Sequence, residues 1–242
     1  MYTKSDKEFM QQLHIEHPHI YERIVDIYNR SQSDLRIGCH DVSNIISLIY
    51  GNYQLISLNR AELSALPRWN ILGNDIKHLI ETMNSIGEYR YACSVEKSCV
   101  DAHTYITDTM NRLCNVLAIP TSNVRLNLDT AGCRINIDSN KISYVLKALI
   151  LNIIEIDSDA LINVDAEVSG DNLYISISDS VGGVSNIVEP RMFEPFNTDN
   201  ATCAGMSLAT SYRILLAHDG ELTYAPNNNN GSTFTLSIPA LI

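Results

Sequence analysis

The sequence has no run of about eighteen apolar residues, the length that a membrane-spanning helix needs. Its N-terminal stretch, Met1 to Glu8, contains too many polar residues for a secretory signal. Neither of the two usual routes to a membrane or to secretion is therefore visible in the residues. We expect a cytoplasmic protein that has no membrane partner.

Basic residues are also scarce. The chain has 17 Lys and Arg against 28 Asp and Glu, which gives a formal net charge of -11 at pH 7. Binding to nucleic acid depends on Lys and Arg that neutralise phosphates. The composition therefore argues against a nucleic-acid partner.

Paired cysteines are missing too, because none of the six cysteines forms a Cys-x-x-Cys motif. We expect reduced thiols that mostly pack, and neither a zinc site nor a disulfide framework. Three histidines, His14, His17 and His19, lie close in sequence, but helical geometry does not bring all three rings together. A solvated histidine-rich face is the simpler interpretation. The cysteines are Cys39, Cys93, Cys99, Cys114, Cys133 and Cys203.

What the chain does have is length and hydrophobic periodicity. Its 242 residues, 45% of them hydrophobic, suffice for one large domain or two modest ones. Apolar residues recur at helical spacing over residues 7–28, 36–58 and 67–86. Pro18 should bend or interrupt the first helix, whereas Pro67 can open the third.

Two amphipathic helices joined by a short loop form a hairpin that leaves one apolar side uncovered. A second copy of the chain could cover that side in a dimeric four-helix bundle. Alternatively, the N-terminal helix could cover it within one chain.

The pattern of hydrophobic residues changes after an expected linker at residues 87–98. A helix is expected over 100–117, and then short alternating strands interleave with helices near 140–156 and 206–218. This mixture predicts an α+β protein in which a sheet carries helices on one face. We expect an N-terminal helical extension (1–30), a helical hairpin (31–95) and an α/β sandwich domain (96–242). The expected strands cover 124–128, 134–137, 160–168, 173–178 and 232–239.

His40 lies off the apolar stripe of its helix, on a polar face that it shares with Asn44 and Ser47. A neutral imidazole held on a rigid helix can act as a nucleophile, and the neighbouring Asp41 could orient it or take its proton. A lone surface histidine without a role is the competing interpretation. The stripe consists of Val42, Ile45, Ile49, Tyr53 and Ile56.

The pattern around this histidine, His-Asp-x-x-Asn-x-x-x-x-Ile-x-Gly-Asn-x-x-Leu, begins at His40 and ends at Leu55. It resembles the phosphoacceptor helix of two-component sensor histidine kinases, in the variety that reads His-Asp-Phe-Asn-Asn. The resemblance implies that His40 is phosphorylated, that Asp41 assists, and that Asn44 helps to handle the attacking group. It also implies a homodimer.

Four stretches of the second half resemble the ATP-binding domain that histidine kinases share with gyrase and Hsp90-type ATPases. These are an Asn box ending at Asn152, an Asp-x-Gly-x-Gly box from Asp179 to Gly183, a Phe box over 192–196, and a lid motif around Gly205. The resemblance implies Asn152 as a ligand of Mg²⁺ on ATP, Asp179 as the acceptor of the adenine amino group, and Gly183 and Gly205 as close-approach positions. A hydrogen-bonded structural role for Asn152 is the alternative.

Several residues depart from the family pattern. Ala148 replaces the first Asn of the Asn box, Val181 replaces the first glycine of the Asp box, and Cys203 and Ser207 add side chains to the lid. Bare backbone amides are what a phosphate cradle needs. The ATP site therefore reads as degenerate.

Three functions remain open at this point. The first is a histidine-kinase-like phosphotransferase that carries phosphate on His40 and passes it to or from an Asp of a response-regulator receiver domain. The second is an active kinase that uses ATP and Mg²⁺ to phosphorylate His40. The third is an inert dimeric scaffold that binds a response regulator.

Overall fold

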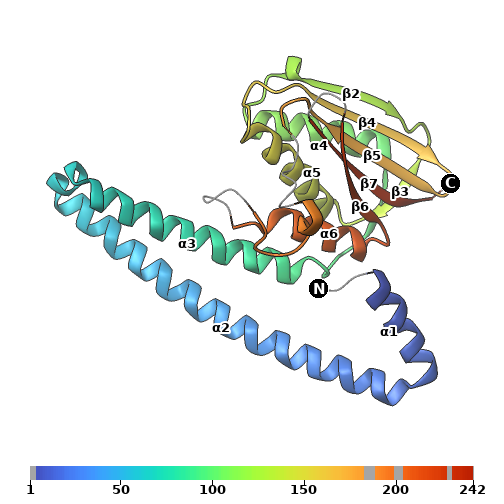
Figure 1. Ribbon diagram of the computed structural model, residues 1–242, viewed down its shortest axis with the longest axis horizontal. Helices are drawn as coiled ribbons and strands as arrows, with labels where there is room; N and C mark the ends of the chain where they lie inside the picture. Colours follow the sequence, from blue (N-terminus) through green and yellow to red (C-terminus); the bar gives the residue numbers. More distant parts are fainter. Residues whose placement is uncertain (1–3, 183–188, 199–203, 228–230, 242) are drawn as a thin grey trace. The chain divides into compact units, whose positions relative to one another are not determined.

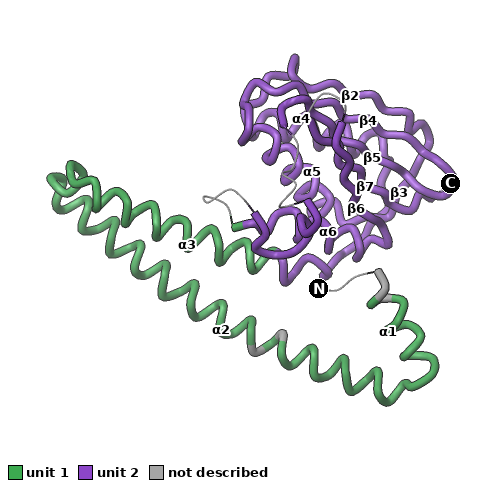
Figure 2. Tube along the Cα trace, in the orientation of Figure 1, with its two compact units in different colours: residues 1–88, 202–204 green, residues 89–201, 205–242 purple. Residues whose placement is uncertain are grey.

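The computed structural model describes residues 4–182, 189–198, 204–227 and 231–241. The chain divides into two compact units, residues 1–88 with 202–204 and residues 89–201 with 205–242 (Figure 2). In the described part of the chain, no helix is both long and apolar enough to cross a membrane. The architecture confirms the expected α+β class: a helical N-terminal region precedes an α/β domain (Figure 1).

The first unit is built from α1 (Lys4–Glu16), α2 (Pro18–Asn59), a short 3-10 helix η1 (Ala61–Ala65) and α3 (Pro67–Tyr91). The predicted interruption at Pro18 and the predicted start at Pro67 are both confirmed. The expected end of the first helix near Tyr28 is wrong, because α2 runs unbroken for 42 residues. No Pro or Gly lies between Tyr28 and Leu35, so nothing in the sequence breaks the backbone there.

Aromatic packing joins α2 to the start of α3. The ring of Tyr53 stacks on Trp69 at 4.7 Å, and its hydroxyl donates to the Trp69 carbonyl at 3.2 Å. The indole of Trp69 donates to Ser57 Oγ at 2.9 Å. Gly73 is required beneath this pair, since a Cβ there would lie 2.3 Å from the Tyr53 hydroxyl.

The apolar stripe of α2 remains largely uncovered in this unit. Val42, Ile45 and Ile49 are 45%, 57% and 50% exposed. Only Ile46 and Ile76, 8% and 6% exposed, are buried aliphatic side chains among the described residues of the hairpin. Burial within the hairpin alone therefore supplies little of the hydrophobic stabilisation that such a stripe can give.

The second unit is a seven-stranded sheet with helices on one face (Figure 1). The strand order is β1-β3-β7-β5-β4-β2, and β6 also pairs with β7. The β2–β4 pair is parallel and the others are antiparallel. The strands are β1 (Ser98–Asp101), β2 (Val124–Asp129), β3 (Arg134–Ile137), β4 (Ile162–Ser169), β5 (Asn172–Ser178), β6 (Glu221–Pro226) and β7 (Ser232–Leu241).

The core of this unit lies between the sheet and its helices. Alternate residues of β5, Leu173, Ile175 and Ile177, are fully buried beneath them, as period-two strands require. Helix α5 contributes Leu146 and Leu149 to the same core. The helical elements are α4 (Ala102–Val116), η2 (Thr121–Asn123), α5 (Ser139–Ile154), η3 (Glu189–Arg191) and α6 (Ser207–Ala217).

Strand β6 is not among the strands expected from the sequence, and two further details differ. Helix α3 continues to Tyr91, so the first part of the expected linker at 87–98 is helical. The end of that linker and the start of the helix expected over 100–117 form β1, which pairs with β3 from Ser98 to Asp101. Asp101 then caps α4 by accepting the backbone N–H of Thr104 at 2.9 Å.

Candidate functional site

His40 lies in the middle of α2, and its side chain is 72% exposed. One turn further on, Asn44 places its amide nitrogen 3.2 Å from Nδ1 of the ring. The carboxylate of Asp41 lies 3.5 Å from the same nitrogen. The structure therefore brings together the three residues that the sequence singled out. Both Asp41 and Asn44 contact Nδ1 of His40.

This arrangement leaves Nε2 of His40 directed away from both Asp41 and Asn44. When the Asn44 amide donates to Nδ1, the ring proton lies on Nε2; when Nδ1 carries the proton, it can donate to Asp41, and the Asn44 carbonyl can accept it after an amide flip. The second state leaves a lone pair on Nε2. In that state Nε2 can act as a nucleophile, because Asp41 stabilises the tautomer that carries its proton on Nδ1.

Asp179 follows β5 in the second unit and is 5% exposed. One carboxylate oxygen accepts the N–H of Val181 at 2.9 Å, and the other accepts the N–H of Ser232 at 3.3 Å. Burial raises the pKa of this carboxyl, and the two backbone donors only partly offset that effect. A buried carboxylate on the helix-covered side of a sheet is suited to accept an amino group from a ligand.

The loop after Asp179 is braced from the β6–β7 turn. The Asn227 amide donates to the carbonyl of Asp179 and, at 3.3 Å, to the carbonyl of Ser232. Gly231 must lack a side chain, because a Cβ there would lie 2.0 Å from the Asp179 carbonyl oxygen. Asn227 was not identified from the sequence, because the run of Asn before Gly231 indicates a turn but does not show which other strand lies beside it.

Val181 stands where the family pattern has a glycine. Its side chain packs against the hydrophobic core, so in this structure it is drawn inward by burial. Gly182 follows with φ of 128°, a backbone conformation that favours glycine. Gly183, the second expected close-approach position, lies outside the described residues.

Asn152 lies in the last turn of α5 and is half-buried. Among the described residues its side-chain amide has no hydrogen-bond partner, while its neighbour Leu149 is fully buried in the core. The amide of Asn152 is not among the described buried polar atoms that lack a partner, so it is open to water or to a ligand. The end of α5 also approaches the Asp179 loop, since Ile156 lies 3.8 Å from the position of a Cβ on Gly182.

Gly205 precedes α6 with φ of 63°. A Cβ on Gly205 would lie 3.0 Å from the backbone nitrogen of Asn197. The carbonyl of Gly205 accepts the N–H of Phe196 at 3.0 Å. The following Met206 is the N-cap of α6 and offers no side-chain hydrogen bond to the first turn. Within the described ranges, the first N–H groups of α6 therefore have no side-chain cap from the N-cap residue, and such N–H groups can hold an anion.

Each of these residues is of a kind that can bind one part of a nucleotide with its magnesium ion. Asp179 is a buried acceptor, Asn152 is an amide with no partner among the described residues, and the start of α6 after Gly205 has no cap from the Met206 side chain. A purine, a cation and phosphates need these three kinds of group. His40 belongs to the other unit.

Comparison with known proteins agrees with these features. Residues 137–242 match the family described as histidine kinase-, DNA gyrase B-, and HSP90-like ATPase. The sensor histidine kinase ZraS of Escherichia coli K12 is 30% identical over 206 residues, which are 84% of this chain and 44% of ZraS. The histidine-protein kinase AtoS of the same strain is 24% identical over 208 residues, which are 83% of this chain and 33% of AtoS.

This chain thus spans less than half the length of these relatives. Among solved structures, full-length ShkA in complex with AMPPNP aligns with a TM-score of 0.68 at 16% identity, over 86% of this chain and 46% of ShkA. This likeness extends the shared fold over most of the chain.

Proposed function

Because this chain has the catalytic core of a two-component histidine kinase, we propose that it carries a phosphoryl group on His40 and passes it to or from an aspartate of a response-regulator receiver domain. The observation that carries the proposal is the placement of Asp41 and Asn44 on one ring nitrogen of His40, with the other ring nitrogen left to solvent. The packing of a helical bundle does not by itself require these three polar side chains.

The transfer step follows from the geometry. With Nδ1–H directed to Asp41, the Nε2 lone pair attacks the phosphorus of an aspartyl phosphate; the N–P bond forms, the aspartyl O–P bond breaks, and the receiver carboxylate leaves. The Nδ1 proton stays on the ring, where Asp41 stabilises the positive charge. The reverse step returns the phosphoryl group to a receiver. The high exposure of His40 suits this exchange, since the second reactant is itself a protein domain.

ATP-dependent phosphorylation of His40 is a second candidate, and a specific observation favours it. Asp179 presents a buried carboxylate, and Asn152 has a half-buried amide that no described residue occupies and that a cation could therefore take. In this scheme Asn152 holds Mg²⁺, which would offset phosphate charge, while Asp179 accepts the adenine amino group and the amides around Gly205 hold phosphate. The departures at Val181 and Ser207 argue for a weaker, degenerate site.

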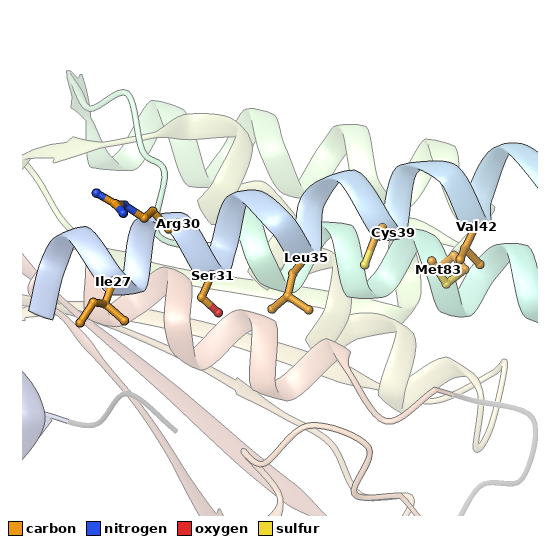
Figure 3. A pocket seen from close by; sticks show the side chains of 8 residues that line it. Ile27, Arg30, Ser31, Leu35, Cys39, Val42 and Met83 are labelled. Atoms are coloured by element: carbon orange, nitrogen blue, oxygen red, sulfur yellow. The ribbon is translucent and has the colours of Figure 1, made fainter.

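We further propose that two copies associate through α2 and α3 into a four-helix bundle. A groove of about 730 Å³ lies between these helices (Figure 3). Its walls include the apolar side chains of Leu35 and Val42 from α2 and Met83 from α3, and it continues the exposed stripe of Ile45 and Ile49. Contiguous apolar surface of this kind marks an interface.

The first experiment separates the two candidate sources of phosphate. Binding of ATP with Mg²⁺ is measured by calorimetry for the wild-type chain and for Asn152→Ala and Asp179→Ala. A micromolar dissociation constant that both substitutions abolish supports a working kinase site, and phosphorylation of His40 from ATP is then tested. No binding at millimolar nucleotide rules out the kinase and leaves transfer from a phosphorylated receiver.

The second experiment tests the carrier itself. Receiver domains that have been phosphorylated with acetyl phosphate are mixed with the chain, and acid-labile phosphate on the chain is measured. We expect labelling that His40→Gln abolishes. If His40→Gln behaves as wild type in binding and signalling, the chain is a scaffold and the carrier proposal fails.

A further inference from the structure

The face of the sheet away from the helices carries a second candidate binding site in the same unit. A cavity of about 470 Å³ lies there, where β2, β4, β5 and β7 run side by side. It differs from the nucleotide side, because consecutive residues of a strand point to opposite faces: Ile177 is buried under the helices, whereas Ser178 lines the cavity. Its lining residues are Arg125, Leu161, Asn163, Ser178, Asp179, Ser180, Asn227 and Thr233.

Four of these residues form one straight row across the sheet. The strand register pairs Arg125 with Asn163, Asn163 with Ser178, and Ser178 with Thr233. Adjacent strands are about 4.8 Å apart, so a guanidinium, an amide and two hydroxyls follow one another at that spacing. Such a row offers hydrogen-bond donors in a fixed order along one line.

None of the four side chains has a hydrogen-bond or ion-pair partner within the described ranges. The next row on the same face shows a different pattern, since its members are paired with each other. Asn127 donates to Asp165 at 3.2 Å, and the hydroxyls of Ser176 and Thr235 lie 2.9 Å apart. The lack of pairing therefore belongs to the row beside the cavity and is not general to this polar face.

The charge of the row points to the ligand. Arg125 is the cationic residue of the lining, and a guanidinium with amide and hydroxyl donors matches the acceptor oxygens of an oxyanion. Asp179 is the acidic residue at the end of the lining, but its side chain, next after that of Ser178, is directed to the helix-covered side, where its carboxylate accepts the N–H groups of Val181 and Ser232. Leu161 adds an apolar wall on which a carbon skeleton could rest.

We propose that this cavity binds a small molecule through its carboxylate or phosphate group, with Arg125 as the charged anchor and Asn163, Ser178 and Thr233 as hydrogen-bond donors. The site is independent of the proposed phosphoryl transfer at His40. It adjoins the nucleotide side through the backbone of Asp179, which follows Ser178 directly.

The test is a titration of the ¹⁵N-labelled full chain with inorganic phosphate and, separately, with acetate, at constant ionic strength kept with chloride. We expect saturable shifts of the Arg125, Asn163, Ser178 and Thr233 amide signals by at least one of the two anions. For ligands of so few atoms, a dissociation constant of about millimolar is expected. Phosphate alone would identify a phosphate-bearing ligand, and acetate alone a carboxylate.

Matched variants make the test specific. Arg125→Gln should weaken binding by about tenfold or more. Arg134→Gln, which removes the same charge from an exposed position on β3, and Asn127→Ala, in the paired row, should leave it unchanged. The proposal is overturned if neither anion gives saturable shifts at these four residues, or if Arg125→Gln and Arg134→Gln bind alike.

Discussion

At the scale of single residues, Asn44 has the clearest consequence. Its amide contacts the same nitrogen of His40 that faces Asp41, so it fixes the ring rather than reacting itself. We predict that Asn44→Ala slows phosphoryl transfer through His40 by about tenfold to a hundredfold, because the tautomer and orientation of the ring are no longer held. The rate of phosphate exchange with a receiver domain measures this.

Ser47→Ala is the matched control for that prediction. Ser47 lies on the same polar face, but its hydroxyl only donates to the backbone carbonyl of Ser43. Its removal should leave the rate near that of the wild type. Equal rates for Asn44→Ala and Ser47→Ala would contradict a positioning role for Asn44.

His218 makes a second residue-scale prediction. Its ring is 2% exposed, Nδ1 lies 2.7 Å from the carbonyl of Ile214, and Nε2 accepts the N–H of Asp138 at 2.9 Å. Both contacts are satisfied only by the neutral ring protonated on Nδ1. Burial lowers the pKa of His218, and the hydrogen bond to Ile214 and the charges of Lys97, Asp138 and Asp219 leave that direction unchanged.

The sign of the pH dependence follows. The unfolded chain takes up a proton at this histidine as the pH falls below about 6.5, whereas the folded chain resists it until the lower folded pKa. The free energy of unfolding of the second unit should therefore decrease as the pH falls through that window. Urea titrations at several pH values, followed by the amide signals of this unit, measure it.

A comparison of two variants isolates this contribution. His218→Gln should remove much of the slope between pH 6.5 and the folded pKa, while His103→Gln, at an exposed histidine of the same unit, should retain it. An unchanged slope in His218→Gln would show that other groups cause the pH dependence.

The residue scale also shows where sequence reasoning reached its limit. The spacing of His40, Asp41 and Asn44 on one helix is local, so the sequence alone predicted that they would share a face. The bracing of Asp179 by Asn227 is not local, because the two are 48 residues apart and meet through the pairing of both β5 and β6 with β7. The inward packing of Val181 is not local either, because the core that it contacts is built from elements far apart in the sequence.

At the scale of elements, the start of α5 links several parts of the second unit. Asp138 caps the helix by accepting the N–H groups of Asn140 and Lys141 at 3.1 and 3.2 Å, and it also accepts that of Glu96 at 3.0 Å. Burial alone would raise the pKa of Asp138, but these three backbone donors outweigh it and lower the pKa. One side chain thus holds the helix start and the segment that enters the sheet.

We predict that Asp138→Ala lowers the free energy of unfolding of this unit by about 2 kcal/mol, at the upper end for an N-cap because a third donor also loses its acceptor. Asn140→Ala, two residues further on, should change the free energy of unfolding little, since Asn140 takes part in the cap through its backbone N–H. Urea titrations measure both. A cost for Asp138→Ala no larger than that for Asn140→Ala would refute the cap.

Elements with strong local signals were predictable, and the others were not. Pro67 and the apolar period after it placed the start of α3, and alternation placed β5. The four residues of β1 have no alternation to detect, and they form a strand only because β3 lies beside them. The continuity of α2 past Tyr28 was missed because the motif around His40 suggested a separate helix.

At the scale of the whole molecule, class and order were predictable but pairing was not. The change from helical to alternating periodicity predicted a helical region followed by an α/β domain. The position of β7 between β5 and β3, and the parallel pairing of β2 with β4, join segments far apart in the sequence. Hydrophobic pattern gives the faces of strands, whereas such long-range neighbours depend on the packing of the complete sheet.

Association is the prediction that belongs to this largest scale. If two copies pack through α2 and α3, Ile45 lies inside the bundle, and Ile45→Glu places one carboxylate per protomer in an apolar interface. An unpaired buried charge costs about 3 kcal/mol or more, so the dimer dissociation constant should rise by at least about a hundredfold. Sedimentation at micromolar concentration should show a dimer for the wild type and a monomer for Ile45→Glu.

Ser47→Glu provides the matched control, because it adds the same charge two residues away on the polar face of α2 that carries His40. It should remain a dimer, since a charge on that face stays in water. Both variants should keep the amide spectrum of the second unit, whose core does not include α2. A monomeric wild type, or a dimer that Ile45→Glu leaves intact, would mean that the exposed stripe of α2 serves another contact and that the bundle is not formed by this face.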